Sequence, residues 1–188
     1  MTLGELLPEH QDAIVQRWLD DVLATYSENA FAVFKRQKDP FTNPVGHNLR
    51  VATRAIFEAL LRAVDGGMDG SDGGMDTEGI RPSLDEVMKI RAVQEFSASE
   101  AVGFVFRLKE AVRAELADVA GDPRLGSELV KLERRIDRIA LAAFDVFVEC
   151  RERMCELRIN EAKRRVPWVV AKINQRDGDP EAAQTRLE

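Results

Sequence analysis

One long stretch near the C-terminus, from Pro123 to Arg165, constrains the fold of this chain more than any other segment. It holds no further proline after Pro123 and no glycine after Gly126. At 1.5 Å per residue, a helix of roughly 40 residues is about 60 Å long, which exceeds the diameter of a small domain. We therefore expect one helix that ends at Pro167 and projects in part beyond the domain. Its apolar residues alternate between spacings of three and four, as one helical face requires: Leu129, Leu132, Ile136, Ile139, Ala143, Val146 and Cys150.

Four shorter segments also have helical periodicity, at about residues 9–26, 44–65, 83–93 and 97–120. Asn43 followed by Pro44 has the form of an N-cap and a first helical residue. Capping boxes, in which serine or threonine stands three positions before glutamate, begin at Thr2, Ser83 and Ser97. These signals predict an all-α fold, a helical bundle of about five helices around the long C-terminal helix.

The segment Gly66–Gly79 is rich in glycine and aspartate and holds methionine as its one apolar residue type. It has too little apolar surface to order itself, so we expect a flexible loop within one domain. That domain spans residues 1–165. The remaining residues, 166–188, are expected to form a tail that is partly disordered.

Composition and charge narrow the classes of partner and compartment. The net charge of −6 disfavours binding to nucleic acid or to an anionic membrane surface. No apolar run approaches the length of a membrane span, and the N-terminus lacks the features of a signal peptide. Cys150 and Cys155 point apart on a helix, so we expect no disulfide between them. The cytoplasm is therefore the expected location.

The sequence holds no motif for a nucleophile, a phosphate loop or a metal cluster, so we expect no catalytic activity, no metal and no cofactor. His47 is either a metal or haem ligand or a solvated histidine, and no second ligand stands one helical turn away. Asp65, Asp69, Gly70 and Asp76 match four positions of a calcium loop, but Gly67 occupies a position that needs an oxygen ligand.

Asp145 is the lone charge in the run Ile139–Val148, which is otherwise apolar. A helix that is apolar on all sides is buried on all sides, so we expect this run to form the core of the domain. A buried carboxylate needs a partner. Two readings stay open: Asp145 pairs with Arg91, with Lys109 as another candidate, or it reaches solvent at a groove.

Six motifs occur in order along the chain: Asp39-Pro-Phe-Thr-Asn-Pro-Val-Gly46, Ile90-Arg-Ala-Val-Gln-Glu-Phe96, Ala101-Val-Gly-Phe-Val-Phe-Arg-Leu-Lys109, Arg135-Ile-Asp137, Ala143-Phe-Asp145 and Glu156-Leu-Arg-Ile-Asn-Glu161. Over roughly residues 5–165 they resemble the N-terminal domain of RsbRD, the RsbT co-antagonist family. The resemblance implies a helical input module of bacterial stress-response signalling, and it supplies no catalytic or cofactor residue. These motif residues either serve signalling or have a purely structural role in turns and helix packing. The positions to test first are Asp39, Pro40, Phe41, Asn43, Pro44, Gly46, Arg91, Gln94, Phe96 and Asp145.

Similar domains precede a histidine kinase or another output region, but too few residues follow Arg165 for a STAS domain or a kinase. We therefore expect either an input module without a covalently attached output or a fragment of a longer protein. In both cases we expect a non-catalytic sensory or regulatory module, and a stand-alone module would act through a protein partner in trans. A signal would alter packing around the middle of the long helix and be read at its charged end. The apolar stripe from Leu129 to Cys150 either supports a homodimer or faces the core of the same chain. The alternative function is a small-molecule or haem-binding, globin-like helical domain that uses His47 or an apolar pocket.

Overall fold

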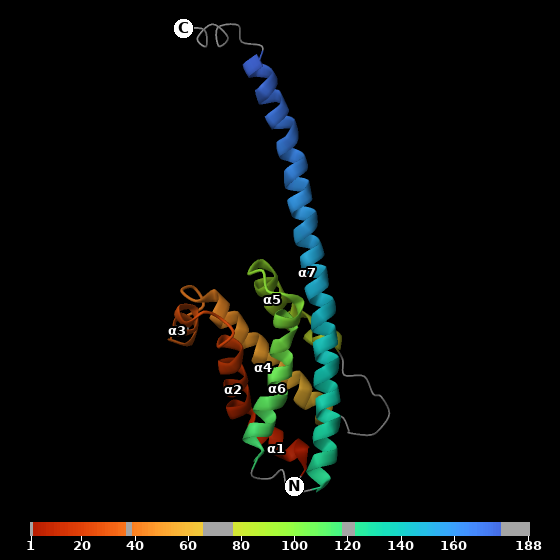
Figure 1. The fold of residues 1–188 in the computed structure, drawn as a ribbon. Helices are drawn as coiled ribbons and strands as arrows, with labels where there is room; N and C mark the ends of the chain where they lie inside the picture. Colours follow the sequence, from red (N-terminus) through yellow and green to blue (C-terminus); the bar gives the residue numbers. More distant parts are fainter. Residues whose placement is uncertain (1, 37–38, 66–76, 118–122, 178–188) are drawn as a thin grey trace. The chain divides into compact units, whose positions relative to one another are not determined.

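The computed structural model describes residues 2–36, 39–65, 77–117 and 123–177, which form helices and no strand (Figure 1). The all-α fold predicted from the sequence is confirmed. The described helices are α1 (Leu3–Glu9), α2 (Gln11–Leu23), α3 (Glu28–Arg36), α4 (Pro44–Asp65), α5 (Thr77–Val93), α6 (Ala98–Glu115) and α7 (Pro123–Asp177). They exceed the predicted number because α1 and α3 are short additional helices.

The chain divides into two compact units, Met1–Cys150 and Arg151–Glu188, and helix α7 contributes residues to both. Within the first unit, α4 packs against α5 and α2, and α2 also packs against α6. The predicted apolar stripe of α7 is buried in this unit, with Leu132, Ile136, Ile139 and Ala143 fully inaccessible to solvent. Of its two possible roles, this stripe therefore serves the core of its own chain.

Polar contacts fix the position of α7 along its neighbours in the first unit. The Leu3 N–H donates to Glu128 Oε2 at 2.6 Å, which ties the start of α7 to α1. Lys109 Nζ lies 2.6 Å from Asp137 Oδ1, and this pair connects α6 to α7. The Lys109–Asp137 pair is only part-buried, and ion pairs near the surface contribute about 0–1 kcal/mol. The main effect of these contacts is therefore to set the register of the helices.

The opposite face of α7 is not covered by the bundle. Leu141 is 67% exposed and Phe144 is 45% exposed, although both lie in the run predicted to form the core. The prediction that this run is buried on all sides is therefore wrong. Helices α1, α5 and α6 make polar contacts with α7, and apolar composition alone does not reveal which sides of a helix receive a neighbour.

Two helix boundaries also differ from those predicted. Helix α5 begins at Thr77 and contains Pro82, so the capping box at Ser83 is not a helix start. Burial of Ile80 and Leu84 on one face of α5 favours the longer helix. Pro82 is the sixth residue of α5, so this burial offsets the lost hydrogen bond and the crowding that a proline introduces there. Pro167 lies inside α7, so it does not end that helix. The capping boxes at Thr2 and Ser97 are confirmed.

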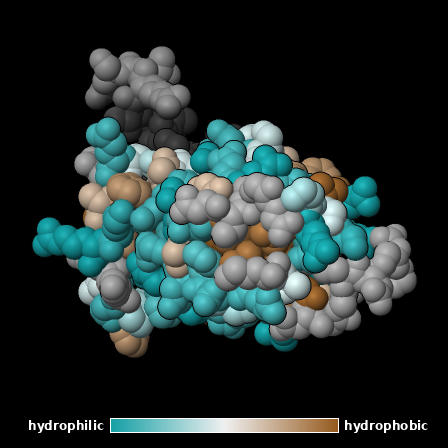
Figure 2. Space-filling view, turned by 90° about the horizontal axis from the view of Figure 1, so that it is seen from below, coloured by the Kyte–Doolittle hydropathy of each residue, from teal (hydrophilic) through white to brown (hydrophobic). Residues whose placement is uncertain are grey.

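Residues 77–79 of the predicted Gly66–Gly79 loop are helical, and residues 66–76 lie outside the described ranges. Cys150 and Cys155 are both free thiols, as predicted. In the described parts of the chain, no helix combines the length and apolarity that crossing a bilayer requires. Figure 2 shows hydrophilic residues over most of the visible face, with a few hydrophobic residues between them.

Candidate functional site

The turn that precedes α4 is built around the side chain of Asp39. Its carboxylate accepts hydrogen bonds from the backbone N–H groups of Phe41 at 3.4 Å and Thr42 at 3.2 Å. These bonds favour the ionised form, and the one from Phe41 contributes most to a lowered pKa of Asp39. Pro40 is exposed and presets the backbone of the turn. Asp39 and Pro40 therefore have local structural roles.

Asn43 ends the turn as the predicted N-cap, with Pro44 as the first residue of α4. Its Oδ1 accepts from the Gly46 N–H at 2.9 Å, and its Nδ2 donates to the Phe34 carbonyl at 3.0 Å. The side chain is almost completely buried, so these bonds are sheltered from water. A Cβ at Gly46 would lie only 2.3 Å from Asn43 Nδ2. Only glycine therefore fits beside this cap.

Phe41 is the exception in this turn because 93% of its side chain is exposed. Its backbone N–H is used by Asp39, but its ring neither caps a helix nor fills the core. A large apolar side chain that is held exposed on an anchored turn is available for binding.

Arg91 is fully buried in α5, the only charged side chain in the described core. Its Nη1 donates to the Glu100 carbonyl at 2.8 Å, whereas Nε and Nη2 have no hydrogen-bond partner. The guanidinium carbon lies 5.0 Å from the ring centroid of Phe96, 5.2 Å from that of Phe104 and 5.8 Å from that of Tyr26. Burial lowers the pKa of Arg91, and the three rings supply cation–π attraction in place of a carboxylate.

The end of α5 positions Phe96 over Arg91. The Phe96 N–H donates to the Arg91 carbonyl at 3.2 Å and the Glu95 N–H donates to the Ala92 carbonyl at 3.3 Å, which is a Schellman motif. Glu95 adopts the left-handed conformation, with φ of 62°, that this motif requires. Gln94 is exposed and its N–H bonds to the Ile90 carbonyl. The motif residues Arg91, Gln94 and Phe96 thus form one structural unit.

Aromatic contacts connect this unit to the Asp39–Gly46 turn. Tyr26 lies between them, with ring centroids 5.5 Å from Phe96 and 5.3 Å from Phe34. Phe34 in turn carries the carbonyl that Asn43 binds. Trp18 stacks on Phe104 and donates its Nε1–H to the Phe104 carbonyl at 2.7 Å. We call the five rings of Trp18, Tyr26, Phe34, Phe96 and Phe104 the aromatic cluster.

Arg91 and Phe96 were predicted as positions to test, whereas the other rings that surround the guanidinium, those of Tyr26 and Phe104, were not. Tyr26, which follows the end of α2, and Phe104, on α6, belong to apolar patterns that are typical of an ordinary helical core. The available signal was Arg91 itself, because a cation on the buried face of α5 needs either a carboxylate or aromatic neighbours.

Asp145 is exposed and does not pair with Arg91, so the proposed buried ion pair is wrong. Asp145 lies on the uncovered side of α7, near Leu141 and Val148, where a carboxylate keeps its hydration. Lys109, the other suggested partner, pairs with Asp137 instead. Asp145 therefore reaches solvent, as the second interpretation predicted, on an open face of α7.

His47 is half-buried and lines an open pocket of about 320 Å³ between α4 and α5, together with Asn48, Val51, Ala52, Pro82, Ser83 and Glu86. Within the described ranges, histidine, cysteine, aspartate and glutamate form no group of three that could hold a metal ion. Of the calcium-loop pattern, Asp69, Gly70 and Asp76 lie outside those ranges.

Ionisation of Tyr26 offers a direct test of the aromatic cluster. Burial raises the pKa of Tyr26 above its ordinary value of 10.0, against an opposing effect of Arg91. A raised folded-state pKa stabilises the fold below the unfolded-state pKa, and that stability is lost as the pH rises through the folded-state pKa. Tyr26 is the only tyrosine, so the ultraviolet absorbance of tyrosinate reports it alone.

We expect the midpoint of the Tyr26 titration to be higher in the native protein than in urea. We also expect Tyr26→Phe to lose less stability at alkaline pH than the parent does. Equal midpoints would place Tyr26 in water.

The comparisons with known proteins identify one family. The family model described as the RsbT co-antagonist protein rsbRD N-terminal domain matches residues 12–162. The match includes the Asp39–Gly46 turn, Arg91 and the whole aromatic cluster. No curated protein and no solved structure matches the chain.

Proposed function

Because the chain belongs to the RsbRD N-terminal domain family, we propose that it is a non-catalytic sensory or regulatory module of stress-response signalling that acts on a protein partner in the cytoplasm. The family takes its name from the rsbRD protein, which is described as an RsbT co-antagonist, and such a role is performed through protein contacts. The exposed charged residues between Glu156 and Arg165 are a further surface at which we expect the output to be read.

Phe41 is the observation that carries this proposal. Asp39, Asn43 and Gly46 are each engaged in building the turn, so their residue types follow from folding alone. The ring of Phe41 has no such role and is held in water, where an apolar group is unfavourable. An aromatic anchor at the tip of a rigid turn matches the side chains that dominate protein interfaces.

Phe41→Ala therefore tests the proposal. We expect the unmodified protein to capture RsbT, or a protein bound to it, from native cell extract, and we expect Phe41→Ala to reduce the captured amount by about tenfold, as for loss of a hot-spot residue. Val93→Ala, which shortens another side chain that is 67% exposed, is the matched control. Both variants should keep the thermal unfolding midpoint of the parent. Equal capture by Phe41→Ala and the parent would contradict this role for the turn.

Self-association belongs to the same proposal, and the uncovered face of α7 is the surface we assign to it. Leu141, Phe144 and Val148 are exposed and follow the spacing of three and four that lets two helices pack together. A second copy would bury this apolar face, so we expect a homodimer.

Light scattering at about 100 µM, well above a micromolar dissociation constant, tests the dimer. We expect the double variant Leu141→Lys/Phe144→Lys to be monomeric, since its new charges would be buried in the interface. Val93→Lys on α5 should leave the mass unchanged. A monomeric parent protein would rule the dimer out and leave the capture experiment unaffected.

A further inference from the structure

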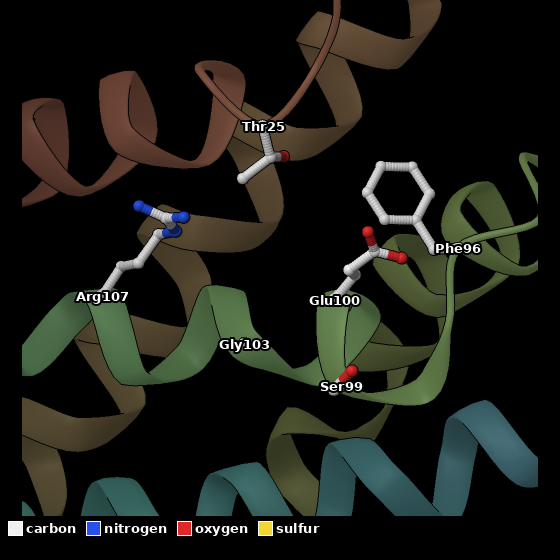
Figure 3. A pocket seen from close by; sticks show the side chains of 6 residues that line it. All are labelled: Thr25, Phe96, Ser99, Glu100, Gly103 and Arg107. Carbon is white, nitrogen blue, oxygen red and sulfur yellow. The ribbon is translucent and has the colours of Figure 1, made fainter.

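A pocket of about 430 Å³ lies beside the aromatic cluster, at the first half of α6. It is lined by Thr25, Phe96, Ser99, Glu100, Gly103 and Arg107. Figure 3 shows that Arg107 and Glu100 extend from the same side of α6, on either side of Gly103, toward the segment that carries Thr25. The pocket is large enough for a small organic molecule.

The charges around this pocket are unbalanced. Arg107 makes no hydrogen bond and no ion pair with any described residue. Arg91 is fully buried behind Phe96 and Glu100, and its Nε and Nη2 also lack partners. The two guanidinium groups are close enough to repel each other, which contributes to the lowered pKa of Arg91. An anion in the pocket would compensate this excess of positive charge.

Glu100 is the one carboxylate that lines the pocket, and it is already engaged. Its Oε2 accepts from the Ser97 N–H at 2.9 Å and from the Ser97 hydroxyl at 2.6 Å, which closes the capping box of α6. The Ser97 oxygen atoms in turn accept from the N–H groups of Glu100 and Ala101. Two N–H groups of the first turn of α6 are thus already used within the helix cap, Arg107 is the cation that can hold an anion here, and Glu100 disfavours a ligand with two negative charges.

Gly103 keeps the middle of the pocket open. A Cβ at this position would meet no atom within 4 Å, so neither packing nor a tight turn requires glycine here. Glycine inside a helix such as α6 is destabilising relative to alanine. Phe96 adds an aromatic wall, so the pocket combines one available cation with apolar surface.

We propose that this pocket binds a small organic monocarboxylate, with its carboxylate on Arg107 and its apolar body over Gly103 against Phe96. A guanidinium fork matches the two oxygens of a carboxylate. The inference gives a ligand class to the sensory role proposed above and rests on that role for its biological meaning. The ligand reports on α5 and α6 through Phe96, which contacts both the pocket and Arg91.

Titration of the full chain with benzoate and hexanoate, followed by amide chemical shifts, tests the proposal without any protein partner. At about 10 mM, which would saturate a site with a millimolar dissociation constant, we expect shifts centred on residues 96–107. Benzyl alcohol, which lacks the charge, and inorganic phosphate, which lacks the apolar body, should each bind about tenfold more weakly or not at all.

Two variants separate the pocket from general charge effects. Arg107→Gln should weaken benzoate binding by about tenfold or more. Gly103→Leu fills the open space on a helix that tolerates leucine better than glycine, so it should fold at least as stably as the parent and lose binding. Arg54→Gln, which removes an exposed arginine elsewhere on the surface, should bind benzoate as the parent does.

Three outcomes would each overturn the proposal: no chemical-shift changes with benzoate and hexanoate, benzoate binding that neither pocket variant weakens, or phosphate binding as tight as benzoate binding. Because partner capture is measured without added carboxylate, either proposal can fail while the other holds.

Discussion

Gly46→Ala is expected to destabilise the first unit by about 2–4 kcal/mol, because overpacking and loss of a helix N-cap occur together. The added Cβ would lie 2.3 Å from Asn43 Nδ2, 2.8 Å from its Oδ1 and 2.9 Å from its Cγ. Asn43 would have to move and would give up its bonds to the Gly46 N–H and the Phe34 carbonyl. Urea unfolding followed by circular dichroism measures the change.

Gly126→Ala is the matched control because a Cβ there meets no atom within 4 Å. It lies in α7, where alanine is favoured over glycine by up to about 1 kcal/mol, so this variant should be neutral or stabilising. If the collision with Asn43 is the cause, Gly46→Ala should cost much less in an Asn43→Ala background, where the colliding atoms are gone. Additive effects in this cycle would refute the steric explanation.

Arg91→Ala is expected to destabilise the first unit by about 3–5 kcal/mol, the range for removing a large buried side chain. Truncation leaves a cavity between the rings of Tyr26, Phe96 and Phe104, and it removes the hydrogen bond to the Glu100 carbonyl. Both losses follow from complete burial of the guanidinium.

Arg91→Met separates the contribution of volume from that of charge. Methionine fills similar space with polarizable apolar atoms that also pack well on rings. It loses the cation–π attraction of about 2 kcal/mol but removes a buried charge without a carboxylate partner, so we expect it to lie within about 1 kcal/mol of the parent. A cost as large as that of Arg91→Ala would show that the charge itself is required.

Asp145→Ala provides the control for these measurements. Asp145 is exposed, so its removal should change stability by no more than about 0.5 kcal/mol and should be additive with Arg91→Ala. Non-additive changes in the free energy of unfolding would instead indicate an ion pair between Asp145 and Arg91, which the exposed position of Asp145 excludes.

Local signals in the sequence were sufficient for much of the secondary structure. The N-cap at Asn43 and the box at Ser97 were predicted because a cap depends on residues within one turn of each other. The box at Ser83 failed because burial of Ile80 extends α5 toward its N-terminus, and that burial depends on a neighbouring helix.

The candidate site was only partly predictable. Asn43 and Gly46 belong to one turn, so their importance was visible as a motif, whereas the exposure of Phe41 was not. The environments of Asp145 and Arg91 could not be predicted from the sequence either. Both residues interrupt apolar runs, yet Asp145 lies in water and Arg91 lies at the centre of the aromatic cluster.

Periodicity and capping residues were enough to predict that this chain is helical, where most of its helices lie and which residues form the apolar stripe of α7, because both act between residues close in the chain. The folded arrangement was needed to show that this stripe faces the core, which side of α7 stays uncovered, which rings surround Arg91 and where a pocket opens beside Gly103. Those features depend on contacts between helices far apart in sequence, and no local pattern specifies which neighbour a given face will meet.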